Sequence, residues 1–315
     1  MTTSLGRPGP QEVALTGADQ AERMIEMVVD SVSSPSTKRN YARGVRDFLS
    51  WYRETGQTVL SKATVQRYVA RLREDGKSPA NVNQRLAAIR KLASEAMDNG
   101  LMPLVLGLGV QHVKGIRQEG HRTGNWLSKR QAETLLNAPD RHTLKGKRDR
   151  AMLAILIGCG LRRQERATLT FGHIQQRDAR WVIVDLVGKR NKVRSVPMPS
   201  WAKARVDVWA TAAGIGQGRV FRPVNKGGRQ DGASMTAQAL YMTVQGYADA
   251  LGLDGLACHD LRRTYAKLAH KGGSAIEQIQ LSLGHASLKT TQVYLGIEQS
   301  MTNAPCDHLG LEVAV

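Results

Sequence analysis

Arginine, histidine and lysine residues accompany one candidate nucleophilic tyrosine in four short segments of the second half of the sequence. These segments are Gly160-Leu161-Arg162 with Glu165, Gly188-Lys189, His259-Asp260-Leu261-Arg262-Arg263-Thr264, and Leu283-Gly284-His285 with Tyr294. Guanidinium groups can bind the non-bridging oxygens of a phosphodiester through forked, permanently charged donors, which lysine cannot imitate. A phenol that neighbouring cations or a base activate can attack the phosphorus atom. The residue types therefore predict phosphoryl transfer with Tyr294 as the nucleophile.

The spacing of these residues is compatible with a single site. His259 and Arg262 are three residues apart and so share a helical face. Tyr294 follows His285 by nine residues (294 − 285), which leaves room for a turn and one short helix. Each residue alone has a plainer interpretation, such as a surface arginine, a histidine at a helix start or a core tyrosine with a solvated hydroxyl. Four ordered blocks together favour a catalytic site.

In this order the blocks resemble the catalytic domain of the tyrosine recombinases, the phage integrase family, over Leu127 to Ile297. The helical segment before Gly100 is similar to the core-binding domain of that family, and the chain resembles its simple two-domain, Xer-like type. The resemblance implies a site-specific recombinase or integrase that cleaves and rejoins DNA strands through a 3′-phosphotyrosine intermediate and a Holliday junction. It also implies double-stranded DNA with a specific core site and a homotetramer on that DNA. It leaves open an accessory DNA-bending or directionality protein.

The chemistry of this reaction gives each candidate residue a role. Arg162 and Arg262 are expected to bind the non-bridging oxygens, and His285 to donate a further hydrogen bond to them. His259 is the candidate base for the phenol. Lys189, at the tip of a predicted hairpin, is the candidate general acid for the departing 5′ oxygen.

Two details beside these residues affect the assignment. Glu165, one helical turn after Arg162, is expected to orient an arginine. At the hairpin tip, residues 188–192, relatives often have glycine after the lysine, so Asn191 is the candidate left-handed turn residue. Lys192 therefore remains an alternative to Lys189 as the general acid.

The sequence indicates neither a metal site nor a nucleotide site. It contains no clustered carboxylates suited to Mg²⁺ and no GxxxxGK[ST] loop, so no cofactor is expected. Cys159, Cys258 and Cys306 are odd in number, far apart and outside any CxxC spacing. They are expected to be buried free thiols.

The elements that position these residues predict a mainly α fold with a small antiparallel β-sheet. The predicted organisation is a flexible tail (1–18), a helical core DNA-binding domain (19–111), a linker (112–126), a catalytic domain (127–297) and a C-terminal tail (298–315). The C-terminal tail is expected to pack against a neighbouring protomer. The chain length exceeds the usual size of one domain, which supports the division.

Apolar periodicity predicts about four helices in the first domain. One spans Met24 to Val32, and a second has Ser36 or Thr37 as its cap and an apolar stripe of Tyr41, Val45, Phe48, Leu49 and Tyr52. A third carries Val65, Tyr68, Val69 and Leu72, and a fourth starts after Ser78-Pro79. The candidate DNA-contacting residues are Lys38, Arg39, Arg43, Asn83, Arg85 and Arg90, together with Arg190 of the hairpin.

In the second domain, Ser128 with Gln131 forms a capping signature, and helices are expected over 151–156 and 161–169. Residues 181–184 and 193–196 predict a hairpin, and helices follow from Met235 past Tyr294. Arg166 stands where an apolar residue is expected, so either it contacts DNA or its helix lies less deeply than in relatives.

The composition agrees with a nucleic-acid partner. Lys and Arg number 45 against 27 Asp and Glu, which gives a formal charge of +18. Many cations at once favour phosphate neutralisation with counterion release. No run approaches the length of a spanning helix, no basic cluster flanks an apolar segment and no signal peptide is evident, so a cytoplasmic protein without membrane attachment is expected.

Three alternatives remain open at this point. A type IB topoisomerase or a hairpin-forming telomere resolvase uses the same chemistry, although the short chain and the compact spacing from His285 to Tyr294 favour a recombinase. A DNA-binding protein that retains the fold without catalysis is the second alternative. A basic protein of membrane surfaces is the third. The DNA sequence of the target and the biological role, whether phage integration, transposition or the resolution of plasmid or chromosome dimers, stay undetermined.

Overall fold

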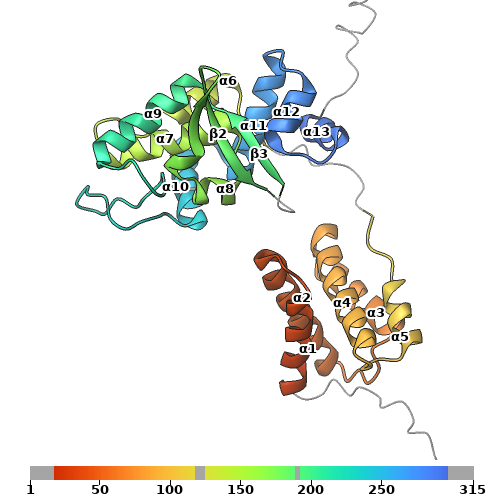
Figure 1. Cartoon of the computed structure of the whole chain (residues 1–315). Coiled ribbons are helices and arrows are strands. Elements are labelled where there is room, and N and C mark those ends of the chain that lie inside the picture. The colour runs from red at the N-terminus through yellow and green to blue at the C-terminus, as the bar shows by residue number, and fades with distance from the viewer. Residues whose placement is uncertain (1–17, 118–124, 189–191, 297–315) are drawn as a thin grey trace, which may run out of the picture. The chain divides into compact units, whose positions relative to one another are not determined.

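The computed structural model describes residues 18–117, 125–188 and 192–296. The chain divides into two compact units, Met1–His121 and Arg122–Val315, each with its own hydrophobic core (Figure 1). The predicted fold class, mainly helical with a small antiparallel sheet, is confirmed. No helix in the described part of the chain is long and apolar enough to cross a bilayer.

The described part of the first unit consists of helices. They are α1 (Ala18–Asp30), α2 (Pro35–Glu54), α3 (Lys62–Glu74), α4 (Pro79–Asp98) and α5 (Leu104–Gln111). The predicted cap of α2 at Ser36 or Thr37 is wrong, because Pro35 already occupies the first turn, where its missing N–H costs nothing. The sequence pattern does not predict α5, since its residues are apolar on all sides and show no amphipathic period.

All the described helices of the first unit contribute to its core, and α2 and α4 supply many of the buried residues. The predicted stripe of α2 is buried at Val45, Phe48, Leu49 and Tyr52. The two helices approach closely at Gly44, where a Cβ would lie 3.1 Å from the Cβ of Ala88. The helices of this unit are thus held by a continuous apolar core.

Part of the segment predicted as a linker packs on this unit. Val113 is buried in its core, and Ile116 packs against it. The side-chain amide of Asn83 donates to the Ile116 carbonyl and accepts from the Ile116 N–H, each at 2.8 Å. Arg90 donates to the Val113 carbonyl. Residues 113–116 are therefore fixed to α4.

The second unit contains the remaining described helices and the sheet. They are α6 (Lys129–Asn137), α7 (Leu144–Cys159), α8 (Arg163–Thr168), the 3-10 helix η1 (Phe171–His173), β1 (Ile174–Arg177), β2 (Arg180–Val187), β3 (Val193–Pro197), α9 (Ser200–Ala213), α10 (Ala237–Ala250), α11 (Cys258–Lys271), α12 (Ile276–Leu283) and α13 (Leu288–Leu295). The strands are antiparallel in the order β1-β2-β3, and Val187 pairs with Val193 at the end of the predicted hairpin. The predicted capping box of Ser128 and Gln131 starts α6.

Helix α7 is the centre of this unit. Its residues from Ala151 to Cys159 are buried, and it packs against α6, α9 and α11 (Figure 1). Cys159 and Cys258 are buried free thiols, as predicted, whereas Cys306 lies outside the described residues. The second core keeps the ends of α7 and α11 in fixed positions, and these ends carry candidate residues.

Arg166 is not available as a surface contact for DNA. It is only 1% exposed, and with Glu165 it forms the buried face of α8, whereas Arg163, Gln164 and Thr168 are exposed. None of its guanidinium nitrogens has a hydrogen-bond partner within the described residues. Burial lowers the pKa of Arg166, because the charged form loses its hydration. The neighbouring Cys258 thiol, whose contact is too weak in geometry to count as a hydrogen bond, only partly opposes this lowering of the pKa.

Candidate active site

The first candidate arginine sits where α7 ends and α8 begins. Gly160 closes α7 in the left-handed conformation, with φ of 57°. A Cβ at this position would lie 2.6 Å from the Tyr265 ring, so only glycine fits the turn. Arg162 then stands at the N-cap of α8, and its backbone N–H donates to Glu165 Oε2 at 2.7 Å.

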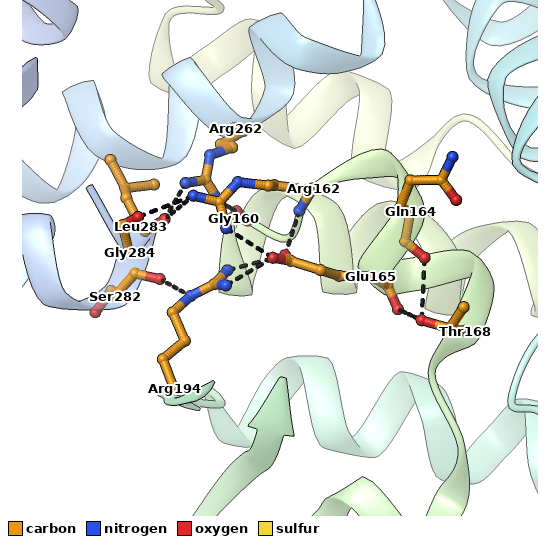
Figure 2. A network of polar contacts seen from close by, with 10 residues as sticks. All are labelled: Gly160, Arg162, Gln164, Glu165, Thr168, Arg194, Arg262, Ser282, Leu283 and Gly284. Atoms are coloured by element: carbon orange, nitrogen blue, oxygen red, sulfur yellow. Dashed lines mark hydrogen bonds and ion pairs between the residues drawn. The ribbon is translucent and has the colours of Figure 1, made fainter. Parts of the chain in front are cut away.

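Three guanidinium groups bind the carbonyl oxygens at the C-terminal end of α12 (Figure 2). Arg162 Nη2 donates to Leu283 O at 2.9 Å and to Gly284 O at 3.0 Å. Arg262, on α11, donates to Leu283 O and, at 2.6 Å, to Gly160 O. Arg194, on β3, donates through Nε to Ser282 O at 2.9 Å. These carbonyls lack partners within their own helix, so cations satisfy them well.

Glu165 links two of these arginines through its carboxylate. Its Oε1 accepts from Arg162 Nη1 at 2.8 Å and from Arg194 Nη1 at 2.6 Å, and its Oε2 accepts from Arg194 Nη2 at 2.9 Å (Figure 2). Burial alone raises the pKa of Glu165, but the hydrogen bonds and charges of Arg194 and then Arg162 outweigh it and hold the pKa at about 2. The carboxylate is therefore ionised at neutral pH.

The second candidate histidine and the tyrosine follow α12. Gly284 ends α12 in the left-handed conformation, and His285 comes directly after it. Ser287 caps α13, which carries Tyr294. The rings of His285 and Tyr294 meet edge to face, with centroids 5.2 Å apart, and His285 Nδ1 lies 3.0 Å from the hydroxyl of Thr291. The turn and short helix predicted between these residues are present.

The N-terminal part of α11 completes the surroundings of Tyr294. The His259 ring lies 5.7 Å from the Tyr294 ring, and the Arg263 guanidinium lies 4.9 Å from the ring centroid. The Tyr294 hydroxyl is 3.5 Å from the His259 carbonyl oxygen. Burial raises the pKa of Tyr294 above that of a free phenol, although the charges of Arg262 and Arg263 oppose the shift. The phenol is thus protonated at neutral pH and needs a base during attack.

The same environment keeps both histidines neutral. Burial, followed by the charges of Arg262 and Arg162, lowers the pKa of His285 to about 4. Burial and the charges of Arg262 and Arg263 also lower the pKa of His259, although this residue remains partly exposed to solvent. Burial beside Arg162 lowers the pKa of Arg262 to about 10, which leaves its guanidinium charged at neutral pH.

The structure brings Arg162, Glu165, Arg262, His285, His259 and Tyr294 into one region. Lys189 and Arg190 lie outside the described residues. Lys192 is exposed, and its carbonyl accepts the Gly188 N–H at 2.8 Å. A Cβ at Gly188 would be 3.1 Å from Arg162 Nη1, so the end of β2 reaches this site.

The candidate DNA-contacting residues of the first unit differ in their availability. Arg39 and Arg43 are exposed on α2, and Lys38 lies 3.8 Å from Asp30. Arg85 pairs with Asp47 and donates to Asn81 at 2.8 Å. As described above, Asn83 and Arg90 bind the backbone of residues 113–116. Residues of α2 and α4 line a small cleft of about 80 Å³: Asn40, Arg43, Gly44, Asn81, Gln84 and Arg85.

No role for Arg194, Arg263 or Thr291 was predicted from the sequence. Arg263 stands inside the segment 259–264, directly after Arg262, so its place beside Tyr294 could have been predicted. Arg194 and Thr291 carry no sequence signal of their own, since their partners are distant or lie across a turn. Within the described residues, no group of three or more His, Cys, Asp or Glu side chains is arranged to hold a metal ion.

Two family models and several curated relatives match most of the chain. The phage integrase family matches residues 125–300, and the phage integrase N-terminal SAM-like domain matches residues 25–100. The tyrosine recombinase XerD of Listeria innocua serovar 6a is 28% identical over 284 residues, which cover 85% of this chain and 90% of the relative. The tyrosine recombinase XerC of Xylella fastidiosa is 26% identical over 274 residues, covering 86% and 89%.

Solved structures share the fold. The XerH site-specific recombinase bound to palindromic difH substrate aligns with a TM-score of 0.69 and 19% identity, over 90% of this chain and 82% of that chain. A lambda integrase dimer bound to a COC′ core site aligns with a TM-score of 0.67 and 13% identity, over 90% and 78%. At these identities the similarity concerns the fold.

The mainly helical two-unit fold and the two family matches place the chain among the DNA recombinases. The chain belongs to the phage integrase family, and the predicted resemblance is confirmed. It is a tyrosine recombinase, an enzyme that breaks and rejoins DNA strands at specific sites.

Proposed function

We propose that Tyr294 attacks a DNA phosphate held by Arg162, Arg262 and His285, and that a specific core site on double-stranded DNA is the substrate. One observation carries this proposal: both arginines bind the Leu283 carbonyl, two residues before His285, whose ring contacts Tyr294. This arrangement gathers two permanent charges, one neutral imidazole and one phenol around a common point. Preorganised donors of this kind stabilise the charge that builds on the non-bridging oxygens during attack.

The proposed cleavage step forms the bond between the Tyr294 oxygen and phosphorus and breaks the bond between phosphorus and the 5′ oxygen. His259 takes the phenolic proton, because its lowered pKa leaves it neutral and able to accept one. Lys189 gives a proton to the departing 5′ oxygen, with Lys192 as the alternative donor. The products are a 3′-phosphotyrosine and a free 5′ hydroxyl, and the hydroxyl of another strand reverses the step through a Holliday junction.

DNA binding by the first unit is proposed to involve α2 and α4. The exposed Arg39 and Arg43, with Lys38 beside them, supply cations for phosphates. The cleft between Arg43 and Gln84 offers amides and a guanidinium that can contact base edges. Arg85 contributes less to binding in this proposal, because Asp47 already pairs with it. Asn83 and Arg90 hold residues 113–116, and DNA contacts by them require those bonds to break.

Strand exchange between two duplexes requires four active sites, so we propose a homotetramer assembled on DNA in the cytoplasm. Residues 298–315, outside the described part, are proposed to pack on a neighbouring protomer. Deleting the residues after Gly296 is expected to abolish synapsis and recombination while leaving DNA binding intact. Unchanged recombination by the deletion variant contradicts packing between protomers. An accessory DNA-bending or directionality protein stays a proposal that a purified reaction tests.

The experiment starts from covalent trapping on a pool of nicked fragments of the host genome, followed by sequencing of the DNA linked to protein. Two copies of the recovered site are then placed on one plasmid. The proposal predicts two recombined circles with the wild-type chain and none with Tyr294→Phe. Relaxation of supercoils without recombination indicates a type IB topoisomerase, and tight binding without any adduct indicates a non-catalytic DNA-binding protein. Either of these results contradicts the proposed function.

A further inference from the structure

The Arg194 side chain makes more hydrogen bonds to the Glu165 carboxylate than the Arg162 side chain does. Two nitrogens of Arg194 bind the two carboxylate oxygens, at 2.6 Å and 2.9 Å. The Arg162 side chain reaches only one of those oxygens, at 2.8 Å. The Arg194 side chain is 10% exposed and that of Glu165 is 3% exposed, whereas that of Arg162 is 31% exposed. The buried pair is therefore Arg194 with Glu165, and Arg162 lies at its open side.

The pairing of Glu165 with Arg194 determines the net charge beside the proposed phosphate site. With Arg194 present, one carboxylate faces two guanidiniums, and the cluster keeps one net positive charge beside the proposed phosphate site. Without Arg194, Glu165 has Arg162 as its sole guanidinium partner among the described residues, and the two neutralise each other. A buried carboxylate with one partner draws that partner strongly, because little water screens it.

We propose that Arg194 is a positioning residue that neutralises Glu165 and so leaves the charge of Arg162 available to the DNA phosphate. This inference rests on the proposed function, since it assumes that Arg162 binds the phosphate. Arg194 also ties β3 to α12 through Ser282 O, so the same residue joins the predicted hairpin to the turn that carries His285.

The test compares two synthetic nicked duplexes that carry the site recovered by trapping. One has the natural phosphodiester at the cleaved position, and the other has a methylphosphonate, in which a methyl group replaces one charged oxygen. Single-turnover formation of the covalent adduct is measured for the wild-type chain, Arg194→Met, Glu165→Gln and the double variant. Arg148→Met is the matched control: Arg148 is a buried arginine bound to Asp149 at 2.7 Å, and it lies about 18 Å along α7 from Gly160.

We expect Arg194→Met to slow adduct formation on the phosphodiester by at least about tenfold, but by less than about threefold on the uncharged methylphosphonate. The double variant Glu165→Gln with Arg194→Met is expected to be at least about fivefold faster than Arg194→Met alone, because the uncompensated carboxylate is gone. Arg194→Lys is expected to keep most of the rate, since it retains the charge. Arg148→Met is expected to slow both duplexes equally or not at all.

Equal losses on the two duplexes, or a double variant as slow as Arg194→Met, overturn the inference while the proposed function stands. If Arg194→Met does not fold, Arg194→Lys decides: near-wild-type adduct formation supports charge compensation, and a loss as large as that of Arg162→Met overturns it. Absence of any adduct with the wild-type chain overturns the proposed function and this inference with it.

Discussion

The hydroxyl of Thr291 lies 3.0 Å from Nδ1 of His285, and Thr291 is buried one helical turn before Tyr294 on α13. Burial is the main cause that lowers the pKa of His285 to about 4, so the ring is neutral at pH 7 and carries one proton, on either Nδ1 or Nε2. We infer that the hydroxyl donates to Nδ1, which puts the proton on Nε2 and makes that nitrogen a donor. A neutral histidine held in this tautomer can still donate to a phosphate oxygen.

Thr291→Val removes this hydrogen bond with little change in shape. We expect adduct formation to fall by about two- to tenfold, the usual range for one hydrogen bond, because both tautomers become populated. Thr290→Val is the matched control, since the exposed Thr290 hydroxyl bonds only to Ser287 within the described residues. A rate for Thr291→Val equal to that of the control contradicts the role of the hydroxyl.

Gly160→Ala is expected to destabilise the second unit strongly. An alanine there adopts a left-handed conformation and also collides with the Tyr265 ring at 2.6 Å. The expected cost is about 2–4 kcal/mol in the free energy of unfolding. Gly214→Ala is the control, because Gly214 has a similar φ of 64° but nothing within 4 Å, so it should lose only about 1 kcal/mol. Equal losses in urea unfolding would show that the ring contact is unimportant.

Acid should weaken the second unit through Glu165. Its pKa is about 2 in the folded chain, below the ordinary value of 4.5. A lowered carboxylate pKa contributes stability that is fully present above the unfolded pKa and is lost as pH falls through the folded one. We expect Glu165→Gln to cost on the order of 3 kcal/mol at pH 7 and clearly less at pH 3. Glu133→Gln, an exposed change on α6, serves as the control; a cost for Glu165→Gln that is independent of pH contradicts the assignment.

The pH profile of cleavage should report His259. Burial and the charges of Arg262 and Arg263 lower its pKa below the ordinary value, so the neutral base predominates at pH 7 and is lost on acidification. Adduct formation should therefore be flat above about pH 7 and fall on acidification. His259→Gln should be slower and lack this acidic limb, whereas His270→Gln, at the far end of α11, should retain it. An unchanged limb in His259→Gln would remove His259 from the role of base.

Much of the site could be predicted because its residues stand at chain features with local signals. Gly160 and Gly284 end helices just before Arg162 and His285. Ser128 and Ser287 cap the starts of α6 and α13 by accepting the backbone N–H three residues further on. These signals depend on a few adjacent residues. They therefore remain visible without knowledge of the packing.

The parts that escaped prediction depend on partners far away in the sequence. Arg194 is a lone cation on a strand, and only packing brings it to Glu165, 29 residues away. Asn83 and Arg90 are residue types that often contact DNA, but each donates a hydrogen bond to the backbone of residues 113–116. Arg166 shows the reverse case, a charge that the fold buries although its residue type predicts exposure.

The identity of the residue that becomes linked to DNA tests the central claim most directly. The trapped complex on the nicked duplex is digested with nuclease and protease, and the modified peptide is sequenced by mass spectrometry. The account predicts one nucleotide attached through its 3′ phosphate to Tyr294. A nucleotide attached to another residue, such as Tyr265 beside Gly160, or linked through a 5′ phosphate, would contradict it.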